Sequence, residues 1–383
     1  WVWPYWVEQQ FDPRTPSFIP RAFSLTHINL THRNWTAVGV PEVRFLPIVD
    51  PRGLVTPFWD GWSLDFWVIL ADNARNLIPS RLKEVSQFEE LNDTLAVVTS
   101  MGESGSTLTT RTEVTLEDRG PVCRIHAAAS ANRPAFLVVS LRPYNPEGVS
   151  FVNTLRVDDS QQQWRINHEP RVILLSPRPD RTLLSTYAEG DVGSRLPGEP
   201  GSSATRTHCD IGLASAAALY PVEGGRQTEA VIRVPLKTRK SSSSGERTPA
   251  GQPQSWHQAL EGACQVNVPD PAIQGLYDRA LRTLILHTPG DRVYAGPYTY
   301  KRFWFRDAVL IGGALLHAGL KDRLHRIMDR FAPHQTHSGY FLSQEGEWDS
   351  NGQVLWLMER FCRATNSRPS SRWIEAAKKG ARW

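Results

Sequence analysis

Hydrophobic positions in the first 240 residues recur in the short, often alternating runs typical of β-strands. The clearest runs are Thr94–Thr99, Thr107–Leu116, Cys123–Ala129, Ala135–Leu141 and Arg171–Ser176. Turn-forming residues separate them at 101–106, 117–121, 132–134 and 145–148. Strands at this spacing favour an antiparallel β-sandwich over residues 1–240 and not a parallel sheet with helices between its strands.

After a polar stretch the hydrophobic period changes from that of strands to that of helices. Residues 241–255 (SSSSGERTPAGQPQS) have almost nothing apolar to bury, so we predict a linker over residues 241–262. Residues 307–319 are apolar on nearly all sides, which predicts a fully enclosed helix. The helix before it is indicated by a helical spacing of Ile273, Leu276, Tyr277, Ala280, Leu281 and Leu284.

Three more helices are expected towards the end of the chain. Residues 320–331 carry one apolar stripe on an otherwise charged helix, residues 350–364 carry a broad apolar face, and Ser370 can cap the last helix. The five helices therefore alternate as outer, inner, outer, inner, outer. Such an order is typical of a toroid of helical hairpins, so we expect residues 263–383 to form part of one.

Composition and charge narrow the classes of function. The chain is 40% hydrophobic and 21% charged, which indicates a sizeable core. It contains no run of about 18 apolar residues, so the sequence predicts no membrane span. The net charge of +4 is small and the basic residues are scattered, which argues against nucleic-acid binding. The four cysteines lack the spacing of metal sites, so we expect no metal and no cofactor. The oligomeric state stays open, and so does the compartment, with a slight preference for the cytoplasm.

Two segments combine aromatic rings with charged groups in a way that suits sugars. Tyr294–Asp307 (YAGPYTYKRFWFRD) runs directly into the predicted enclosed helix. Aromatic rings stack on the apolar faces of sugar rings, and Arg and Asp hydrogen-bond to hydroxyls. Gln344–Trp356 (QEGEWDSNGQVLW) places Glu345, Glu347 and Asp349 beside Trp348.

Each segment also has a purely structural interpretation. Asp307 can be a helix cap with Arg306 as its surface partner, and the acidic loop before residue 350 can be a solvated cap. The position of both segments favours a site, because both precede helices that periodicity assigns to the inside. In a toroid the N-termini of inner helices open at one end, so the two loops should converge on one mouth.

Several motifs resemble those of a known superfamily. FWFRDAVLIGGALLHAGL resembles the W-x-RDA segment of the six-hairpin glycosidases, especially glycoside hydrolase family 15 (glucoamylase and related trehalases) and bacterial amylo-α-1,6-glucosidase-like proteins. EWDSNGQVLWLMERF is similar to their second signature, and RPYNPEGVSF and THRNWTAVG are similar to parts of their β-sandwich. The resemblance runs from about Thr31 to the end and is specific in these short blocks. It implies that residues 263–383 are the N-terminal part of an (α/α)6 toroid that is truncated in this chain.

The resemblance implies roles for six residues, all in substrate binding. Arg306 and Asp307 would hold hydroxyls of the sugar at the nonreducing end, and Asp349 would line the same mouth. Trp304 and Trp348 would be apolar walls, with Tyr300 as a further binding residue. The family's general acid follows the fifth helix and its general base comes much later, so we expect the catalytic pair outside this chain.

A local substitute for the catalytic pair is also weighed. Inverting glycosidases need two carboxyl groups about 6.5–9.5 Å apart. Glu345 and Glu347 are alternate residues of one loop, which rarely present that separation.

The leading interpretation is therefore a glycoside hydrolase that acts on α-linked glucosides or glucans by inversion, with an oligo- or polysaccharide as substrate. A glycoside phosphorylase of the same clan is an alternative that would need a basic, glycine- or serine-lined phosphate pocket near the mouth, and no such pocket is evident in the sequence. A noncatalytic carbohydrate-binding protein is a third possibility.

Overall fold

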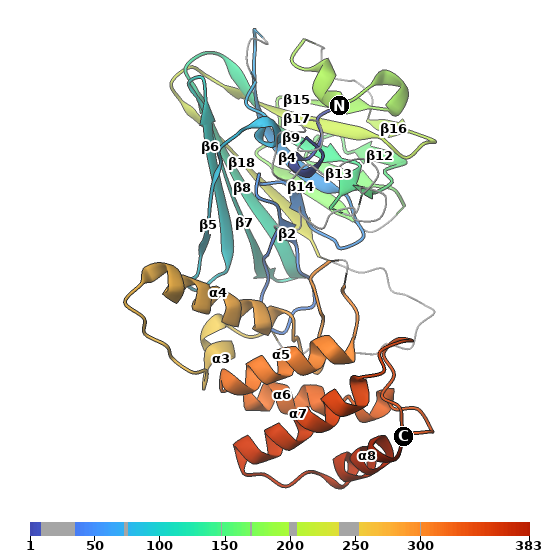
Figure 1. The fold of residues 1–383 in the computed structure, drawn as a ribbon. Coiled ribbons are helices and arrows are strands. Elements are labelled where there is room, and N and C mark those ends of the chain that lie inside the picture. Colours follow the sequence, from blue (N-terminus) through green and yellow to red (C-terminus); the bar gives the residue numbers. More distant parts are fainter. Residues whose placement is uncertain are drawn as a thin grey trace. The chain divides into compact units, whose positions relative to one another are not determined.

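The computed structural model describes residues 1–8, 35–72, 76–146, 148–168, 171–198, 205–236, 253–298 and 300–383. They form two compact units, Trp1–Gly39 with Phe45–Ser244, and Val40–Arg44 with Gly245–Trp383 (Figure 1). Most of the stretch predicted as a linker, residues 241–252, lies outside the described residues, as do residues 31–34 of the THRNWTAVG motif. Within the described residues no helix has the length and apolarity that a bilayer crossing requires.

The first unit contains two large antiparallel sheets. The seven-stranded sheet has the order β1 (Thr36–Ala37), β2 (Ile48–Val49), β3 (Val55–Thr56), β4 (Ser63–Leu70), β9 (Ala135–Arg142), β17 (Ser215–Val222) and β15 (Arg181–Ser185). The nine-stranded sheet has the order β16 (Arg206–His208), β12 (Thr154–Val157), β13 (Gln163–Ile166), β14 (Val172–Ser176), β18 (Gln227–Pro235), β8 (Gly120–Ala131), β7 (Ser106–Glu117), β6 (Ala96–Glu103) and β5 (Ser86–Glu90).

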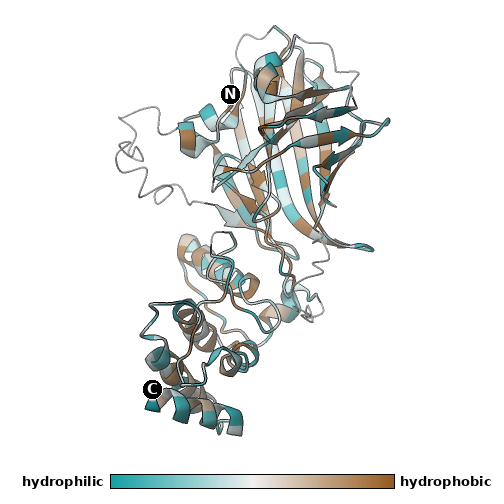
Figure 2. Ribbon diagram, turned by 90° about the vertical axis from the view of Figure 1, so that its right-hand side faces the viewer, coloured by the Kyte–Doolittle hydropathy of each residue, from teal (hydrophilic) through white to brown (hydrophobic). Residues whose placement is uncertain are grey.

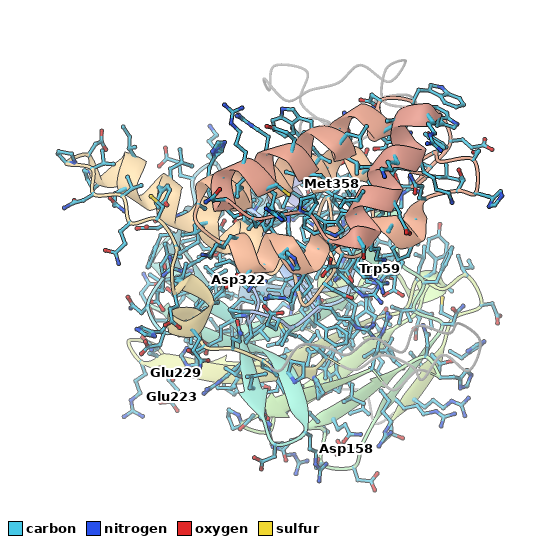
Figure 3. All side chains as sticks on the ribbon, turned by 90° about the horizontal axis from the view of Figure 1, so that it is seen from below. Trp59, Asp158, Glu223, Glu229, Asp322 and Met358 are labelled. Atoms are coloured by element: carbon cyan, nitrogen blue, oxygen red, sulfur yellow. The ribbon has the colours of Figure 1, made fainter. Side chains whose placement is uncertain are left out.

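Smaller elements complete the first unit. They are α1 (Tyr5–Glu8), the 3-10 turns η1 (Pro79–Arg81), η2 (Tyr187–Glu189) and η3 (Val192–Arg195), and the hairpin of β10 (Tyr144–Asn145) and β11 (Gly148–Val149). Strand β4 contacts β7, and β17 contacts β8 and β18, so the two sheets face each other as a sandwich. Asp158, Glu223 and Glu229 lie on the outside of this unit (Figure 3).

The predicted strands are present, and several are longer than expected. Strands β7 and β8 pair from Ser106 with Ala131 to Glu117 with Gly120, so their hairpin includes residues that the sequence assigned to turns. The predicted antiparallel β domain is therefore confirmed. The first half of β7 alternates, because Ser106, Leu108 and Thr110 are buried between more exposed neighbours.

The central strand β4 does not alternate, because all eight of its residues are buried. One of its faces is turned to the other sheet. The opposite face, which includes Trp67 and Ile69, is covered by Val2, Ile78, Val192 and Leu196 from segments outside the strands. A strand buried on both faces reads as a continuous hydrophobic run and carries no period of two.

The second unit is helical. Its elements are α3 (Trp256–Leu260), α4 (Pro271–Leu286), α5 (Phe305–His317), α6 (Lys321–Met328), η4 (Ala332–His334), α7 (Ser350–Thr365) and α8 (Ser371–Arg382). The five helices expected from periodicity are present, and α3 lies inside the range 241–262 that was predicted as a linker. Figure 2 shows hydrophobic and hydrophilic bands along these helices, as expected for elements that are buried on one side.

Helices α5 and α7 lie at the centre of this unit. Helix α5 packs against α4, α6 and α7, and α7 packs against α5, α6 and α8. A Cβ atom at Gly312 would lie 2.8 Å from Leu357 and 2.9 Å from Leu324, so glycine permits this close approach. Met358 of α7 is buried within the unit, whereas Asp322 at the start of α6 is exposed (Figure 3).

The expectation that residues 307–319 are fully enclosed is wrong for the described structure. Leu310 of α5 is 67% exposed, and Trp356 of α7 is 47% exposed. The apolar pattern correctly indicated a central helix, but no described element covers the side that carries Leu310.

The short segment Val40–Arg44 belongs to the helical unit through a buried ion pair. Arg323 Nη2 of α6 lies 2.6 Å from Glu42 Oε1, and the Gly290 amide donates to Glu42 Oε2 at 2.5 Å. Both charged side chains are about 5% exposed. A buried charge is tolerated only when it is paired, so this contact fixes the segment to the helices.

Candidate functional site

The first turn of α5 is capped by side chains from another part of the chain. Trp304 stands at the N-cap position but offers no side-chain hydrogen bond. The Phe305 amide donates to Ser343 Oγ at 3.0 Å, and the Arg306 amide donates to Glu347 Oε1 at 2.7 Å. The loop that precedes α7 therefore satisfies the free amides of α5 and holds the two segments together.

Glu347 is the buried centre of this connection. Its side chain is fully buried, and its second carboxylate oxygen accepts a hydrogen bond from the Ser343 hydroxyl. Both oxygens are thus engaged. Glu347 acts as a structural anchor, and it is not available as half of a local catalytic pair with the exposed Glu345.

Arg306 and Asp349 form a two-pronged ion pair between the first turns of α5 and α7. Arg306 Nε lies 3.2 Å from Asp349 Oδ2, and Arg306 Nη2 lies 2.9 Å from Asp349 Oδ1. Both side chains are about half exposed. The hydrogen bond from Arg306 lowers the pKa of Asp349, so this carboxyl group is ionised at neutral pH. Two loops that are 43 residues apart in sequence therefore meet at one place.

Asp307 is the carboxylate that this network leaves out. It lies in the first turn of α5 and is partly exposed. It forms no hydrogen bond or ion pair with any described residue. The structural interpretation of Asp307 as a side-chain cap paired with Arg306 does not hold here, because Arg306 pairs with Asp349 and the amides are capped by Ser343 and Glu347.

Two aromatic residues, Tyr300 and Trp304, lie shortly before Arg306 in the sequence. Tyr300 is 45% exposed, and its ring packs edge-on against Trp304 at a centroid distance of 5.8 Å. Trp304 is half-buried beneath the guanidinium of Arg302, which is 4.3 Å from its ring centroid. The indole N–H of Trp304 is buried and has no hydrogen-bond partner among the described residues.

Trp348 belongs to a separate stack of rings. It is 68% exposed and stacks on Tyr340 at 5.7 Å, with Trp383 nearly parallel to it at 6.3 Å. Asn351 supports this group by accepting from the Phe341 amide and donating to the Gly380 carbonyl. The stack therefore presents a broad aromatic surface beside Asp349.

The structure thus brings the charged residues into one constellation and gathers the aromatic ones in two groups. Sequence reasoning missed Ser343, Tyr340 and Trp383, and it counted Glu347 only as one acid of a loop. Among the described residues, no group of three or more His, Cys, Asp or Glu side chains has a geometry suited to a metal ion.

Comparison with known proteins relates the chain to others through structure. No protein-family model and no curated protein sequence matches it. A bacterial glucoamylase solved in complex with acarbose matches with a TM-score of 0.61 at 14% identity, over 86% of this chain and 56% of the glucoamylase. A putative kojibiose phosphorylase from the human microbiome matches at 7% identity over 86% of this chain and 49% of its own, with a TM-score of 0.43 that is too low to argue from.

This chain spans little more than half the length of the glucoamylase that it matches. At such low identity the match concerns the fold alone. At that level the chain shares the fold of the matched part of a bacterial glucoamylase.

Proposed function

We propose that this chain is part of a glycoside hydrolase that acts on α-linked glucosides or glucans by inversion, and that it supplies sugar-binding residues. The observation that carries the proposal is the contact of Arg306 with Asp349, together with an unengaged Asp307 beside it. The fold shared with a glucoamylase that was solved with acarbose gives independent support.

The charged groups suit the hydroxyls of a pyranose ring. Arg306 Nη1 makes no hydrogen bond with the described residues, so its N–H groups can donate to a sugar oxygen. Asp307 can accept from two hydroxyl groups. The ion pair fixes Arg306 before a ligand arrives, which lowers the conformational entropy lost on binding.

The aromatic residues would complete the site. Trp348 presents an exposed indole beside Asp349, and Tyr300 is exposed next to Trp304. Indole and phenol rings offer flat apolar surfaces to sugar rings while their polar atoms hydrogen-bond at the edge. The buried indole N–H of Trp304 has no partner among the described residues, so a small rotation would let a sugar hydroxyl accept from it.

The proposal also places α5 and α7 as inner helices of an (α/α)6 toroid. Their first turns are in direct contact through Arg306 and Asp349, as expected if inner N-termini open at one mouth. Proton transfer is assigned to none of these side chains. Asp349 is held ionised by Arg306, and Glu347 is fully buried with both oxygens engaged.

A binding experiment tests the proposal. Maltotriose and acarbose are titrated into the protein by calorimetry, and into an Arg306→Gln variant. Loss of a charged hydrogen-bond donor should weaken binding about tenfold or more. The matched control is Arg363→Gln, which removes an exposed arginine that pairs with Glu359 on the far part of α7 and should bind as the wild type does. Equal affinity in the Arg306 variant, or no binding by the wild type, would contradict the proposal.

A further inference from the structure

An aromatic cavity lies in the sandwich unit, outside the site described above. It has a volume of about 440 Å³ and lies between the N-terminal segment 1–7 and the hairpin of β10 and β11. Trp6 and Tyr144 of its lining are each 6% exposed, whereas Trp3 and Tyr187 are 37% and 48% exposed. With Trp1, five aromatic residues therefore line the cavity from the interior to the surface.

The N-terminal segment is held in a way that gives two tryptophans to this cavity. Val2 is buried in an apolar cluster of the sandwich. Its amide donates to Asp191 Oδ2 at 2.7 Å, and its carbonyl accepts from Arg142 Nη2 at 3.0 Å. Trp1 and Trp3, on either side of Val2, both line the cavity and stack on each other at a centroid distance of 5.8 Å. The core contacts of Val2 thus position a pair of indole rings.

The space between the rings is larger than ordinary packing leaves. Protein interiors are close-packed and contain few voids larger than a water molecule. Rings that only covered the sandwich would close on one another, yet 440 Å³ corresponds to about fifteen water molecules at roughly 30 Å³ each. The volume lies in the range of about 300–1,000 Å³ that is usual for ligand sites.

The charges around the cavity favour a neutral ligand. None of the described lining residues has a charged side chain, so an ion would meet no counter-charge there. Aromatic rings can hold a cation over their faces, but two of these rings already serve Arg142 in this way. Its guanidinium lies 6.0 Å from the ring centroid of Trp1 and 5.4 Å from that of Tyr144.

Hydrogen-bond donors accompany the apolar rings. The indole N–H groups of Trp1, Trp3 and Trp6 and the hydroxyl group of Tyr187 form no hydrogen bond with a described residue. The lining therefore suits a neutral ligand that has flat apolar faces and oxygen atoms at its edge. A pyranose ring has both features.

We propose that this cavity is a second glucan-binding site, in which glucose residues of an α-linked glucan stack on Trp3 and Tyr187. That the sugar is α-linked glucose rests on the proposed function, whereas the sugar site rests on the cavity alone. Both rings are partly exposed, so a sugar can stack on them without rearrangement of the core.

Calorimetric titration with β-cyclodextrin tests this proposal. This cyclic α-glucan has no nonreducing end, which the proposed site around Arg306 requires, so its binding reports the cavity. Trp3→Ala and Tyr187→Ala should each weaken binding about tenfold or more, since aromatic anchors dominate contact energies. The matched control is Trp59→Ala, which removes a 55% exposed tryptophan of the same unit outside the cavity and should bind as the wild type does. Urea unfolding of the three variants checks that each is folded.

The possible outcomes separate this site from the proposed function. No binding of β-cyclodextrin by the wild type, or the same affinity in the Trp3, Tyr187 and Trp59 variants, overturns the cavity site. Cellohexaose, a β-linked glucan, binding as tightly as maltohexaose in a manner that depends on Trp3 overturns the assignment of an α-glucan.

Maltotriose titrations of the Trp3→Ala protein, with and without Arg306→Gln, then report the proposed site of the helical unit alone. If Arg306→Gln has no effect there while β-cyclodextrin binding depends on Trp3 and Tyr187, the result counts against the proposed function and leaves the cavity site standing.

Discussion

Two ion pairs of the same chemistry occupy opposite environments in this protein. In the sandwich, Arg142 Nη1 and Nη2 lie 2.8 and 2.5 Å from the two oxygens of Asp191, and the side chains are 0% and 1% exposed. In the helical unit, Arg306 and Asp349 form an equally two-pronged pair, and their side chains are 49% and 48% exposed.

Every side-chain polar atom of the buried pair itself is engaged within the fold. Asp191 also accepts from the Val2 and Gly193 amides at 2.7 and 2.9 Å. Arg142 donates to the Val2 carbonyl at 3.0 Å, and its guanidinium lies 5.2 Å from the centroid of Trp67. The exposed pair keeps N–H groups and a neighbouring carboxylate unengaged. An Arg–Asp pair thus stabilises the core of the sandwich, whereas the same type of pair in the helical unit is accessible to a ligand.

The largest effect on stability is expected from Asp191→Asn. Neutralising one partner leaves Arg142 charged and buried, which typically costs about 3–5 kcal/mol. The free energy of unfolding is measured in urea by circular dichroism. The control is Asp72→Asn, which opens the exposed pair of Asp72 with Arg133 in the same unit and should shift the midpoint little. Equal shifts in the two variants would remove the distinction between buried and exposed pairs.

A smaller effect should appear in the pH dependence of the sandwich, through Asp50, a buried acid that forms no ion pair with a described residue. Burial raises the pKa of Asp50 to about 7, and its Oδ2 atom has no hydrogen-bond partner among the described residues. Because the folded state holds this proton more tightly than the unfolded chain, stability should fall as pH rises from about 4 to 7.

Between pH 5 and pH 8 the loss from Asp50 should be about 3 kcal/mol. Asp50→Asn should flatten the urea stability measured at pH 5, 6.5 and 8. Part of the slope should remain, since burial also raises the pKa of Asp65 to about 6. A variant whose pH profile matches that of the wild type would show that Asp50 is ionised in the folded protein.

Local signals explain which parts of the fold were predictable. Strands β6 to β9 are apolar or alternating runs bounded by turn residues, and the helix α8 begins after Ser370, whose hydroxyl accepts from the Trp373 amide as predicted. Strand β4 carried no alternation because both of its faces are buried. Exposure of Leu310 could not be foreseen, since an apolar pattern reports what a helix can bury and not what covers it.

The sequence predicted the residue types of the site, but not which of these residues bind one another or which of them are buried. Because Arg306 and Asp307 are adjacent in the sequence, the structural interpretation paired them with each other. The ion pair instead joins Arg306 to Asp349, which is 43 residues away. Nothing local distinguishes the buried Glu347 from the exposed Glu345 two positions earlier. Tyr340 and Trp383 join Trp348 only through tertiary packing.

The smallest effect on stability and a large effect on binding are expected together at Asp307. Asp307→Asn keeps the shape of the side chain and removes the charge, and no described hydrogen bond is lost. The favourable contact of the carboxylate with the helix N-terminus contributes roughly 0.3–1 kcal/mol, so the urea midpoint should move little.

The most direct test measures maltotriose affinity and urea stability on this one purified variant. If the Asp307 carboxylate accepts a hydrogen bond from a sugar hydroxyl, the affinity for maltotriose should fall about ten- to a hundredfold, because hydrogen bonds to charged groups contribute roughly 1.5–3 kcal/mol. Stability should stay near that of the wild type. Wild-type affinity combined with a clear loss of stability would show that Asp307 is structural and would contradict the proposed sugar site.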